Sequence, residues 1–320
     1  MRKLLPVALA FVLIACRADS QQSILLDTPP ASLTLLGEGF LSTAMNERDF
    51  ALSPDGKEIY FTISTPKSTF QTIVFCKKGK DGWSKPEVAP FAGKYSDLEP
   101  AFSPDGNTLY FASNRPVEGD ALKDFDIWKV TRAGNSWGQP QNLGKPVNTE
   151  ADEFYPSVAK SGNLYFTAAY AGGPGREDIY VSHFKQNEFQ KPVALDTAVN
   201  TRFYEFNAFV SPDEDYIIFT SYGRKDDTGG GDLYISMKDQ NGSWKPARNL
   251  KLLNSKQLDY CPFVSPDGKS LFFTSERHQL PTAFTDRADY KTIDQIKDQP
   301  LNGLGNIYWI SFKSVLNSLK

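Results

Sequence analysis

The stretch FALSPDGKEIYFT, from Phe50 to Thr62, decides the fold because the chain repeats it. Three close copies read AFSPDGNTLYFAS, FVSPDEDYIIFTS and FVSPDGKSLFFTS. The marker serines of the four Ser-Pro-Asp triplets are Ser53, Ser103, Ser211 and Ser265, at intervals of 50, 108 and 54 residues. The middle interval is about twice the others, and YPSVAKSGNLYFTA (155–168) fills it as a fifth copy that has lost the triplet. Repeats of this period indicate a propeller or a solenoid.

Each copy has the same internal order of strands and turns. An apolar run precedes the Pro-Asp-Gly turn, and a run of β-formers such as 109–111 follows it. A loop then leads to a third strand, which begins at Thr72, Asp126, Asp178, Asp232 or Asn306. An aromatic residue and a proline, such as Trp137 and Pro140, precede a fourth strand, which must be an edge strand to tolerate the proline. Five such units predict an all-β fold, a five-bladed propeller of four-stranded antiparallel blades.

The ends of the repeat array predict how the ring closes. The fifth copy runs to the C-terminus without an aromatic-proline turn or a fourth strand. The segment PPASLTLL (29–36) precedes the first copy and matches the fourth strand of another copy, KPVALDTA (191–198). We therefore expect the N-terminal strand to complete the last blade and to remove its open edge.

The repeated SPDG turn, followed by a strand of the Asp-[Ile/Leu]-[Tyr/Trp] type, resembles the TolB-type, WD-repeat-like β-propeller family of bacterial envelopes. The resemblance covers 29–313, and four of the five copies are clear. It implies a propeller in the cell envelope, and its motif concerns the fold much more than a function.

The N-terminus has the pattern of an export signal. A basic start, MRK, is followed by an apolar run (4–15) that is too short to span a bilayer, and the run ends in LIAC. LIAC resembles a lipobox, so residues 1–15 are interpreted as a lipoprotein signal peptide and Cys16 as the lipidation site; the alternative is an ordinary signal peptide. Residues 16–28 then form a tether and 29–320 a single propeller domain, lipid-anchored in the bacterial envelope at the outer membrane, facing the periplasm or the cell surface.

Composition narrows the class of partner. The chain has 35 basic and 38 acidic side chains, so no strongly basic face for nucleic acid is expected. Membrane contact is expected only through the lipid anchor, and the protein is expected to be a monomer. The remaining cysteines, Cys76 and Cys261, are interpreted as buried free thiols, with a disulfide as the alternative.

An acidic residue stands six positions before the marker position in all five copies: Glu47, Asp97, Glu153, Glu205 and Asp259. These five acids should surround one end of the central channel, where the loops between second and third strands also bring Arg115, Arg224 and Arg277. One interpretation is a polar site for a cation, a sugar or a peptide terminus. The other is a structural network, in which each acid caps backbone N–H groups or pairs with arginine and holds neighbouring blades in register.

Residues that break the fivefold pattern are further site candidates. Arg48, Asp49 and Glu99 place charge where other copies carry Tyr155, Asn207 and Cys261, or apolar residues. The 276–305 loop is unusually long and contains DRADYKTIDQIKDQ, which could form a short helix. The candidate ligand-binding set on the channel face is therefore Glu47, Arg48, Asp49, Asp97, Glu99, Arg115, Glu153, Glu205, Arg224, Asp259 and Arg277.

The sequence favours a binding function over catalysis. The two histidines, His183 and His278, lack metal-ligand spacing, and no nucleophile elbow or phosphate loop occurs. No cofactor is expected, and calcium is the ion that the acids would accept. We interpret the chain as a binding or scaffold module for an envelope protein or a glycan. The alternative is a glycan-active hydrolase or lyase that uses acids on the channel face.

Overall fold

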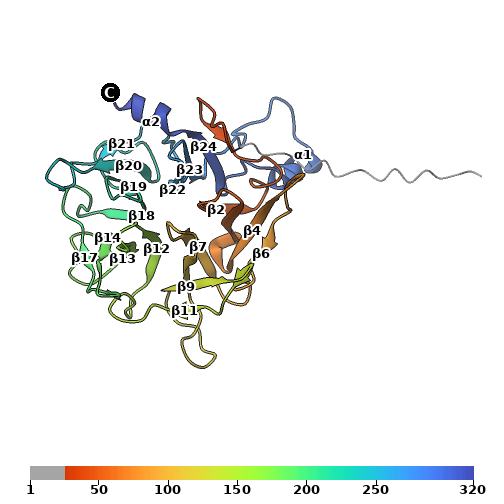
Figure 1. Ribbon diagram of the computed structural model, residues 1–320. Helices are drawn as coiled ribbons and strands as arrows, with labels where there is room; N and C mark the ends of the chain where they lie inside the picture. Colours follow the sequence, from red (N-terminus) through yellow and green to blue (C-terminus); the bar gives the residue numbers. More distant parts are fainter. Residues whose placement is uncertain (1–25) are drawn as a thin grey trace, which may run out of the picture.

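The computed structural model describes residues 26–320, and it is a five-bladed β-propeller of antiparallel sheets (Figure 1). The predicted signal peptide, Cys16 and most of the tether lie outside the described residues. The strands of each blade are given from the innermost outward. Blade 1 consists of β2 (Asn46–Leu52), β3 (Glu58–Ser64), β4 (Gln71–Gly79) and β6 (Glu87–Val88), and blade 2 consists of β7 (Asp97–Phe102), β8 (Thr108–Ser113), β9 (Asp126–Ala133) and β11 (Gln141–Asn142). Blade 3 consists of β12 (Glu153–Val158), β13 (Leu164–Ala168), β14 (Asp178–Ser182) and β17 (Val193–Ala194).

Blade 4 consists of β18 (Tyr204–Val210), β19 (Tyr216–Tyr222), β20 (Asp232–Met237) and β21 (Arg248–Asn249). Blade 5 consists of β22 (Asp259–Val264), β23 (Ser270–Ser275), β24 (Asn306–Ser311) and β1 (Thr34–Leu35). Short hairpins extend the outer strands, where β5 (Gly82–Trp83) pairs with β4, β10 (Ser136–Trp137) pairs with β9, and β15 (Phe184–Lys185) pairs with β16 (Glu188–Phe189). Each fourth strand is only two residues long, which suits an exposed sheet edge.

The N-terminal strand closes the ring as predicted. β1 pairs antiparallel with β24, with Thr34 opposite Trp309 and Leu35 opposite Tyr308. The seam continues beyond the strand, because the Leu36 amide donates to the Ile307 carbonyl at 2.8 Å and the Ser42 hydroxyl donates to the same carbonyl at 3.2 Å. Leu36 is fully buried. The last blade is therefore built from both ends of the propeller sequence.

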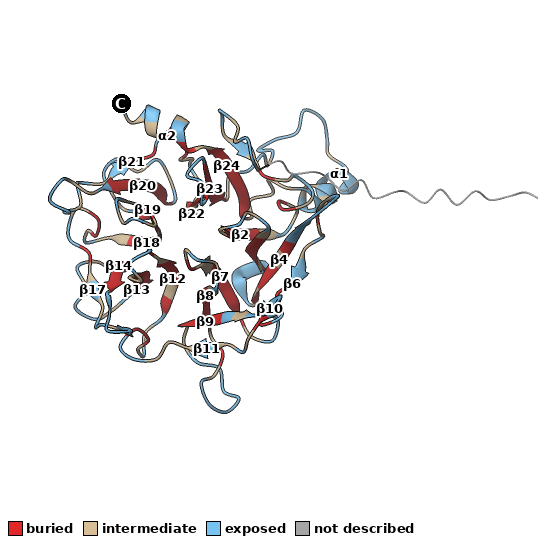
Figure 2. Ribbon diagram, viewed as in Figure 1, coloured by how far each residue is buried: buried red, intermediate tan, exposed pale blue. Residues whose placement is uncertain are grey.

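The hydrophobic core is divided among the seams between blades. Five clusters each join strands of two neighbouring blades, and the buried inner and middle strands are red in Figure 2. At the seam of blades 1 and 2, for example, the Trp137 indole N–H donates to the Tyr60 hydroxyl at 2.8 Å inside a buried aromatic cluster. A smaller sixth cluster around Tyr155, Tyr260 and Cys261 lies near the axis. Burial in every seam explains why each copy keeps the same apolar residues beside its turn.

All five innermost strands carry a bulge at the same place. The pairing register shifts between Arg48 and Ala51 in β2, and equivalent shifts occur in β7, β12, β18 and β22. One residue in each bulge has a positive φ: Asp49, Glu99, Tyr155, Asn207 and Cys261, with φ between 49° and 61°. Non-glycine residues rarely adopt this conformation, and a bulge re-aims a side chain. The five bulge residues are therefore brought toward the axis by the backbone.

Two segments lie outside the blade pattern. The long 276–305 loop contains the short helix α1 (Tyr290–Gln295), as expected, with Asp289 as its N-cap. The C-terminal helix α2 (Phe312–Ser318) follows β24, and it was not predicted; it buries Phe312 and Val315 against the seam of blades 4 and 5. Within residues 26–320, none of the helices has the length and apolar character needed to cross a bilayer. Cys76 and Cys261 are buried free thiols, as predicted.

Candidate functional site

The five acids begin the innermost strands at one end of the channel, which we call the acid mouth (Glu47, Asp97, Glu153, Glu205 and Asp259). All five are at most 1% exposed. Four of them cap the loop that enters their blade: Glu205, for example, accepts from the Thr201 amide at 2.7 Å and from the Thr201 hydroxyl at 2.8 Å. Glu47 and Glu153 accept from Thr43 and Thr149 in the same way, and Asp259 accepts from the Ser255 amide.

The second strand and its loop complete each cap. Ser113, Ser221 and Ser275 donate hydroxyl hydrogen bonds to Asp97, Glu205 and Asp259. Arg115, Arg224 and Arg277 pair with the same three acids, with Nη2 to oxygen distances of 3.1 Å for Glu205 and 2.8 Å for Asp259.

The two blades without an arginine use a neutral donor instead. The Tyr170 hydroxyl donates to Glu153 at 2.8 Å, and the Asn306 amide donates to Glu47 at 3.3 Å. Burial raises the pKa of Glu47 and Glu153 to about 7, with the hydrogen bonds acting against it. Burial also raises the pKa of Asp97, while Arg115 opposes the shift. The five acids of the acid mouth and the three arginines are therefore engaged in hydrogen bonds and ion pairs within the blades and with their entering loops, and the Asn306–Glu47 bond joins blades 5 and 1.

The other three nominated residues converge at the centre of the ring, where they form the channel floor together with the remaining bulge residues (Arg48, Asp49, Glu99, Tyr155, Asn207 and Cys261). Arg48 Nε donates to Asp49 Oδ1 at 2.8 Å, and Arg48 Nη2 donates to Glu99 Oε1 at 2.8 Å. The Cys261 thiol donates to Asp49 Oδ1 at 2.7 Å, and Asn207 Nδ2 donates to Glu99 Oε1 at 3.3 Å. Blades 1, 2, 4 and 5 thus contribute a side chain to one buried polar network, and blade 3 contributes the backbone amide of Tyr155.

Glu99 also accepts a backbone amide in this network, because the second strand of its own blade, β8, has an alanine where other blades have a threonine. In blades 1, 3 and 5 a threonine of the second strand, Thr62, Thr167 or Thr274, accepts the amide of the next blade's bulge residue. Blade 2 has Ala112 at this position. The Tyr155 amide, left without that hydroxyl, instead donates to Glu99 Oε2 at 2.7 Å. The carboxylate of Glu99 therefore replaces a missing threonine hydroxyl.

The channel floor carries two carboxyl groups and one guanidinium. Burial raises the pKa of Glu99 to about 8, against the attraction of Arg48 and with a further contribution from Asp49. Burial and the nearby Asp49 also raise the pKa of the Cys261 thiol, so the thiol stays protonated and remains a donor.

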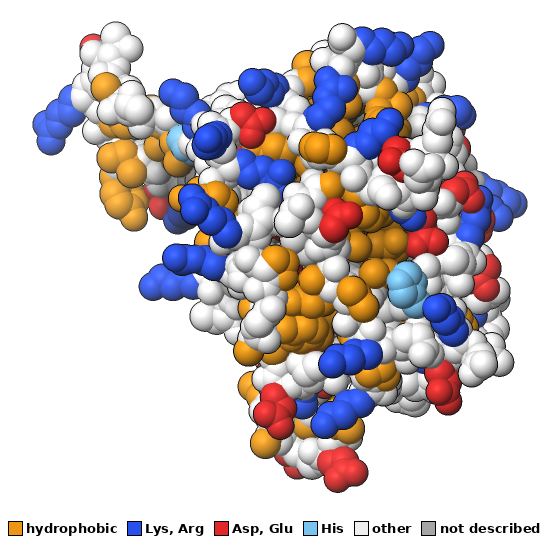
Figure 3. Space-filling view, turned by 90° about the vertical axis from the view of Figure 1, so that its left-hand side faces the viewer, with side chains coloured by type: hydrophobic (Ala, Val, Ile, Leu, Met, Phe, Trp, Pro, Cys, Tyr) orange, Lys and Arg blue, Asp and Glu red, His pale blue; other side chains and the backbone are white. Residues whose placement is uncertain are grey.

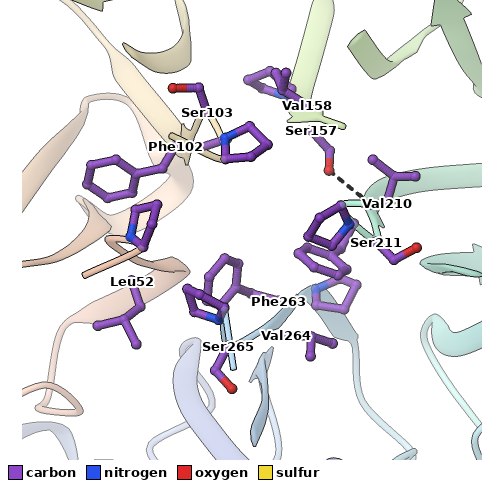
Figure 4. A pocket seen from close by; sticks show the side chains of 18 of the residues that line it. Leu52, Phe102, Ser103, Ser157, Val158, Val210, Ser211, Phe263, Val264 and Ser265 are labelled. Atoms are coloured by element: carbon purple, nitrogen blue, oxygen red, sulfur yellow. Dashed lines mark hydrogen bonds between the residues drawn. The ribbon is translucent and has the colours of Figure 1, made fainter. Parts of the chain in front are cut away.

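A cavity of about 400 Å³ occupies the channel between this floor and the Ser-Pro-Asp turns. We call the end of the channel at these turns the turn mouth; its rim prolines are Pro54, Pro104, Pro212 and Pro266. The aromatic wall of the cavity consists of Phe50, Phe209 and Phe263, in which Phe263 makes edge-to-face contacts with both of the others. Figure 4 shows Phe263 turned toward the centre, whereas Leu52, Val210 and Val264 turn away into the blades.

Smaller residues line the side of the cavity opposite the aromatic wall. Pro100 and Ala101 come from blade 2, and Pro156 and Ser157 come from blade 3. The Ser157 hydroxyl accepts from the Val210 amide at 2.9 Å, the dashed line in Figure 4, and so it is already used. Asp49, Glu99 and Tyr155 close the inner end. The site is thus an apolar, blind channel with a polar floor.

Sequence reasoning placed the site at the acid mouth, and it missed the turn mouth. It identified Arg48, Asp49 and Glu99, but not the aromatic wall, because Phe50, Phe209 and Phe263 look like ordinary core residues of a strand. A register comparison of the copies could have found Phe209 and Phe263, since both stand two positions before the marker serine, where blade 2 has Ala101.

No protein-family model matches the sequence, and no curated protein matches it. Among solved structures, a thermostable family-43 glycoside hydrolase superposes with a TM-score of 0.50 at 14% identity, over 86% of this chain and 92% of that chain. The putative TolB from Agrobacterium tumefaciens gives a TM-score of 0.48 at 16% identity, over 83% of this chain and 90% of that one. An α-L-arabinofuranosidase from Lactobacillus brevis gives 0.48 at 16% identity, over 86% and 92%.

The structural neighbours therefore include a TolB protein, an α-L-arabinofuranosidase and a family-43 glycoside hydrolase. At these identities the likeness concerns the fold alone. It assigns no activity to the channel.

Proposed function

We propose that this chain is an envelope lipoprotein of the TolB-type propeller class, and that it binds a protein or glycan partner through the turn mouth of its channel. The observation that carries the proposal is the 400 Å³ cavity with its aromatic wall. Cavities of this size, mostly apolar with a few polar groups at one end, are typical of binding sites. A partner would place one projecting group in the channel and rest on the rim prolines around it.

The state of the acids favours binding over catalysis. Asp49 is held by Arg48 and Cys261, and Glu99 is held by Arg48, Tyr155 and Asn207. A glycosidase needs two carboxyl groups on either side of a scissile bond, with one free to give a proton and the other free to attack or to activate water. Here both acids are tied to the same guanidinium.

One variant separates a channel-dependent partner from any other. Ala101 lines the cavity at the position where blades 4 and 5 carry Phe209 and Phe263, so Ala101→Phe introduces a residue that the fold already accepts there and fills the channel. Val193, on the outer edge of blade 3 and 57% exposed, provides the control Val193→Ser.

Immobilised wild type, Ala101→Phe and Val193→Ser would be used to capture partners from envelope extracts and to probe a glycan array. We expect a partner that binds wild type and Val193→Ser but not Ala101→Phe. A set of partners retained equally by all three proteins contradicts the proposed site.

The hydrolase alternative rests on one observation, the raised pKa of Glu99, which is the property of a general acid that works near neutral pH. It predicts release of reducing sugar from envelope or plant polysaccharides, lost in Glu99→Gln. Absence of release across a broad glycan panel, together with channel-dependent binding, rejects the alternative.

A further inference from the structure

Carboxyl groups lie at both ends of the cavity. Its charged lining residues, within the described part of the chain, are the acids Asp49, Glu99, Asp213, Asp215 and Asp267 and the single base Lys160. Arg48 lies at the floor and offsets part of the charge of Asp49 and Glu99. Lys160 is paired at 2.9 Å with Asp213 at the rim. Asp267 is likewise paired with Lys269 at 3.0 Å. Glu99 is largely protonated near neutral pH, and a positive ligand beside it would promote its ionisation, so the floor gains a negative charge as such a ligand binds.

The walls determine what kind of cation fits. Phe50, Phe209 and Phe263 offer an aromatic surface and no oxygen ligands, and the nearby prolines are also apolar. A calcium ion requires six to eight oxygen ligands, and no cluster of three or more His, Cys, Asp or Glu placed to hold a metal occurs in residues 26–320. A weakly hydrated organic cation, in contrast, is attracted by aromatic faces and by the carboxylates together.

The floor offers a place for the charged end of such a ligand. Glu99 Oε1 accepts from both Arg48 and Asn207, but Oε2 accepts from the Tyr155 amide alone, which leaves acceptor capacity on Oε2. At the rim, Asp213 is 70% exposed and already paired with Lys160, so its attraction for a second cation is screened by water.

We propose that the channel binds a small organic cation, an ammonium or guanidinium group on an apolar body, with the charge facing Glu99 and the body against the aromatic wall. This inference rests on the proposed function in using the same channel, and it adds the chemical class of the group that enters it. A partner protein or glycan would present such a group, for example a basic side chain or an amino sugar, at its point of contact.

Binding of a cation in the channel should be coupled to the ionisation of Glu99. Glu99 faces Arg48 and Asp49 of β2, the Tyr155 amide of β12 and Cys261 of β22, with Glu177 at the start of blade 3's third strand also raising its pKa. A cation beside Glu99 favours its ionised form, so binding near neutral pH should release a proton, and affinity should rise with pH up to about 8 and level off above it.

Benzyltrimethylammonium is a suitable probe because its charge does not change with pH. Benzyl alcohol is the neutral control, and phenylacetate is the anionic one. Calorimetric titration of wild type should show the cation binding about tenfold or more tighter than the neutral compound, with no detectable binding of the anion. Titrations in two buffers of different ionisation enthalpy measure the released proton.

Three variants complete the test. Ala101→Phe should abolish binding of the cation, and Glu99→Gln should weaken it about tenfold and remove the proton release. Asp294→Asn, at a 40% exposed acid that pairs with Lys297 at 2.6 Å away from the cavity, should change affinity less than about threefold. Circular dichroism checks that each variant is folded, and if Glu99→Gln is not, the three probes on wild type and Ala101→Phe decide the matter.

Equal affinity for benzyltrimethylammonium and benzyl alcohol overturns the cation proposal. If both are lost in Ala101→Phe, the channel still binds ligands and the proposed function survives without the cation. If partner capture is unaffected by Ala101→Phe, the proposed function itself fails, whatever the small probes do.

Discussion

Replacing Glu205 with glutamine tests whether the five acids of the acid mouth are structural caps. Four donors converge on this carboxylate: the Thr201 amide, the Thr201 and Ser221 hydroxyls, and Arg224 Nη2 at 3.1 Å. Glutamine has one acceptor oxygen, and its NH₂ group must face one of these donors. The substitution also removes the charge that pairs with Arg224, while Arg224 keeps its bond to the Val199 carbonyl.

The magnitude follows from these contacts. A hydrogen bond to a charged group contributes about 1.5 to 3 kcal/mol, and a buried donor left without a partner costs about 1 to 3 kcal/mol. The hydroxyls of Thr201 and Ser221 can rotate and accept, which reduces the cost. We therefore expect Glu205→Gln to lower the free energy of unfolding by about 2 to 4 kcal/mol, and the melting temperature by about 3 to 7 °C for a domain of this size.

Differential scanning calorimetry measures the change, with Asp213→Asn as the control. Asp213 is 70% exposed and pairs with Lys160 at 2.9 Å, so its loss should cost less than about 1 kcal/mol. If the carboxylates instead repelled one another as an unoccupied ligand site, neutralising Glu205 would raise the melting temperature. A melting temperature for Glu205→Gln equal to or above that of wild type would refute the structural interpretation.

Three further predictions follow from the closure, the buried acids and the N-terminus. Deleting residues 31–36 should lower the melting temperature far more than deleting 17–24, which lie outside the described residues, because it removes β1 and the buried Leu36; equal melting temperatures would contradict the closure. Because Glu47 and Glu153 have folded pKa values raised to about 7 and Glu99 to about 8, their contribution to stability is fully present below their unfolded pKa near 4.5 and is lost as pH rises through 7 to 8. Thermal melts should therefore be higher near pH 5 than near pH 8.5, and the opposite order would show that these groups are ionised in the folded state. Cys16→Ser should move the protein from the membrane fraction to the soluble fraction, and a variant that stays with membranes would contradict lipidation.

The sequence predicted the blades and their closure because each copy repeats the same residues at the same register. The marker serines and the acids six positions before them are periodic, and burial in every seam requires the same residues in each blade. α2 was missed because it follows the last strand and has no counterpart in the other copies.

The candidate site was predicted only in part, since it depends on the bulges. A strand that alternates regularly would not bring Asp49 and Glu99 together with Cys261, and the bulge that does so leaves no clear mark in the sequence. The role of Glu99 also depends on Ala112 in another strand, a relation that appears only when the two strands are placed side by side.

The strand that closes the ring has a consequence for how the protein is made. Among the strands in residues 26–320, β1 leaves the ribosome first and its partner β24 leaves last, so the apolar residues around Leu36 cannot pair until all five units have been synthesised. Ser42 and Ile307, which bond across the same seam, are 265 residues apart. A chain whose translation stops early has an unpaired edge at each end and cannot hide either, which leaves it open to proteases and to pairing with other chains. Only a chain that has been translated through β24 can pair both edges, and so only such a chain can be protected by closure of the ring.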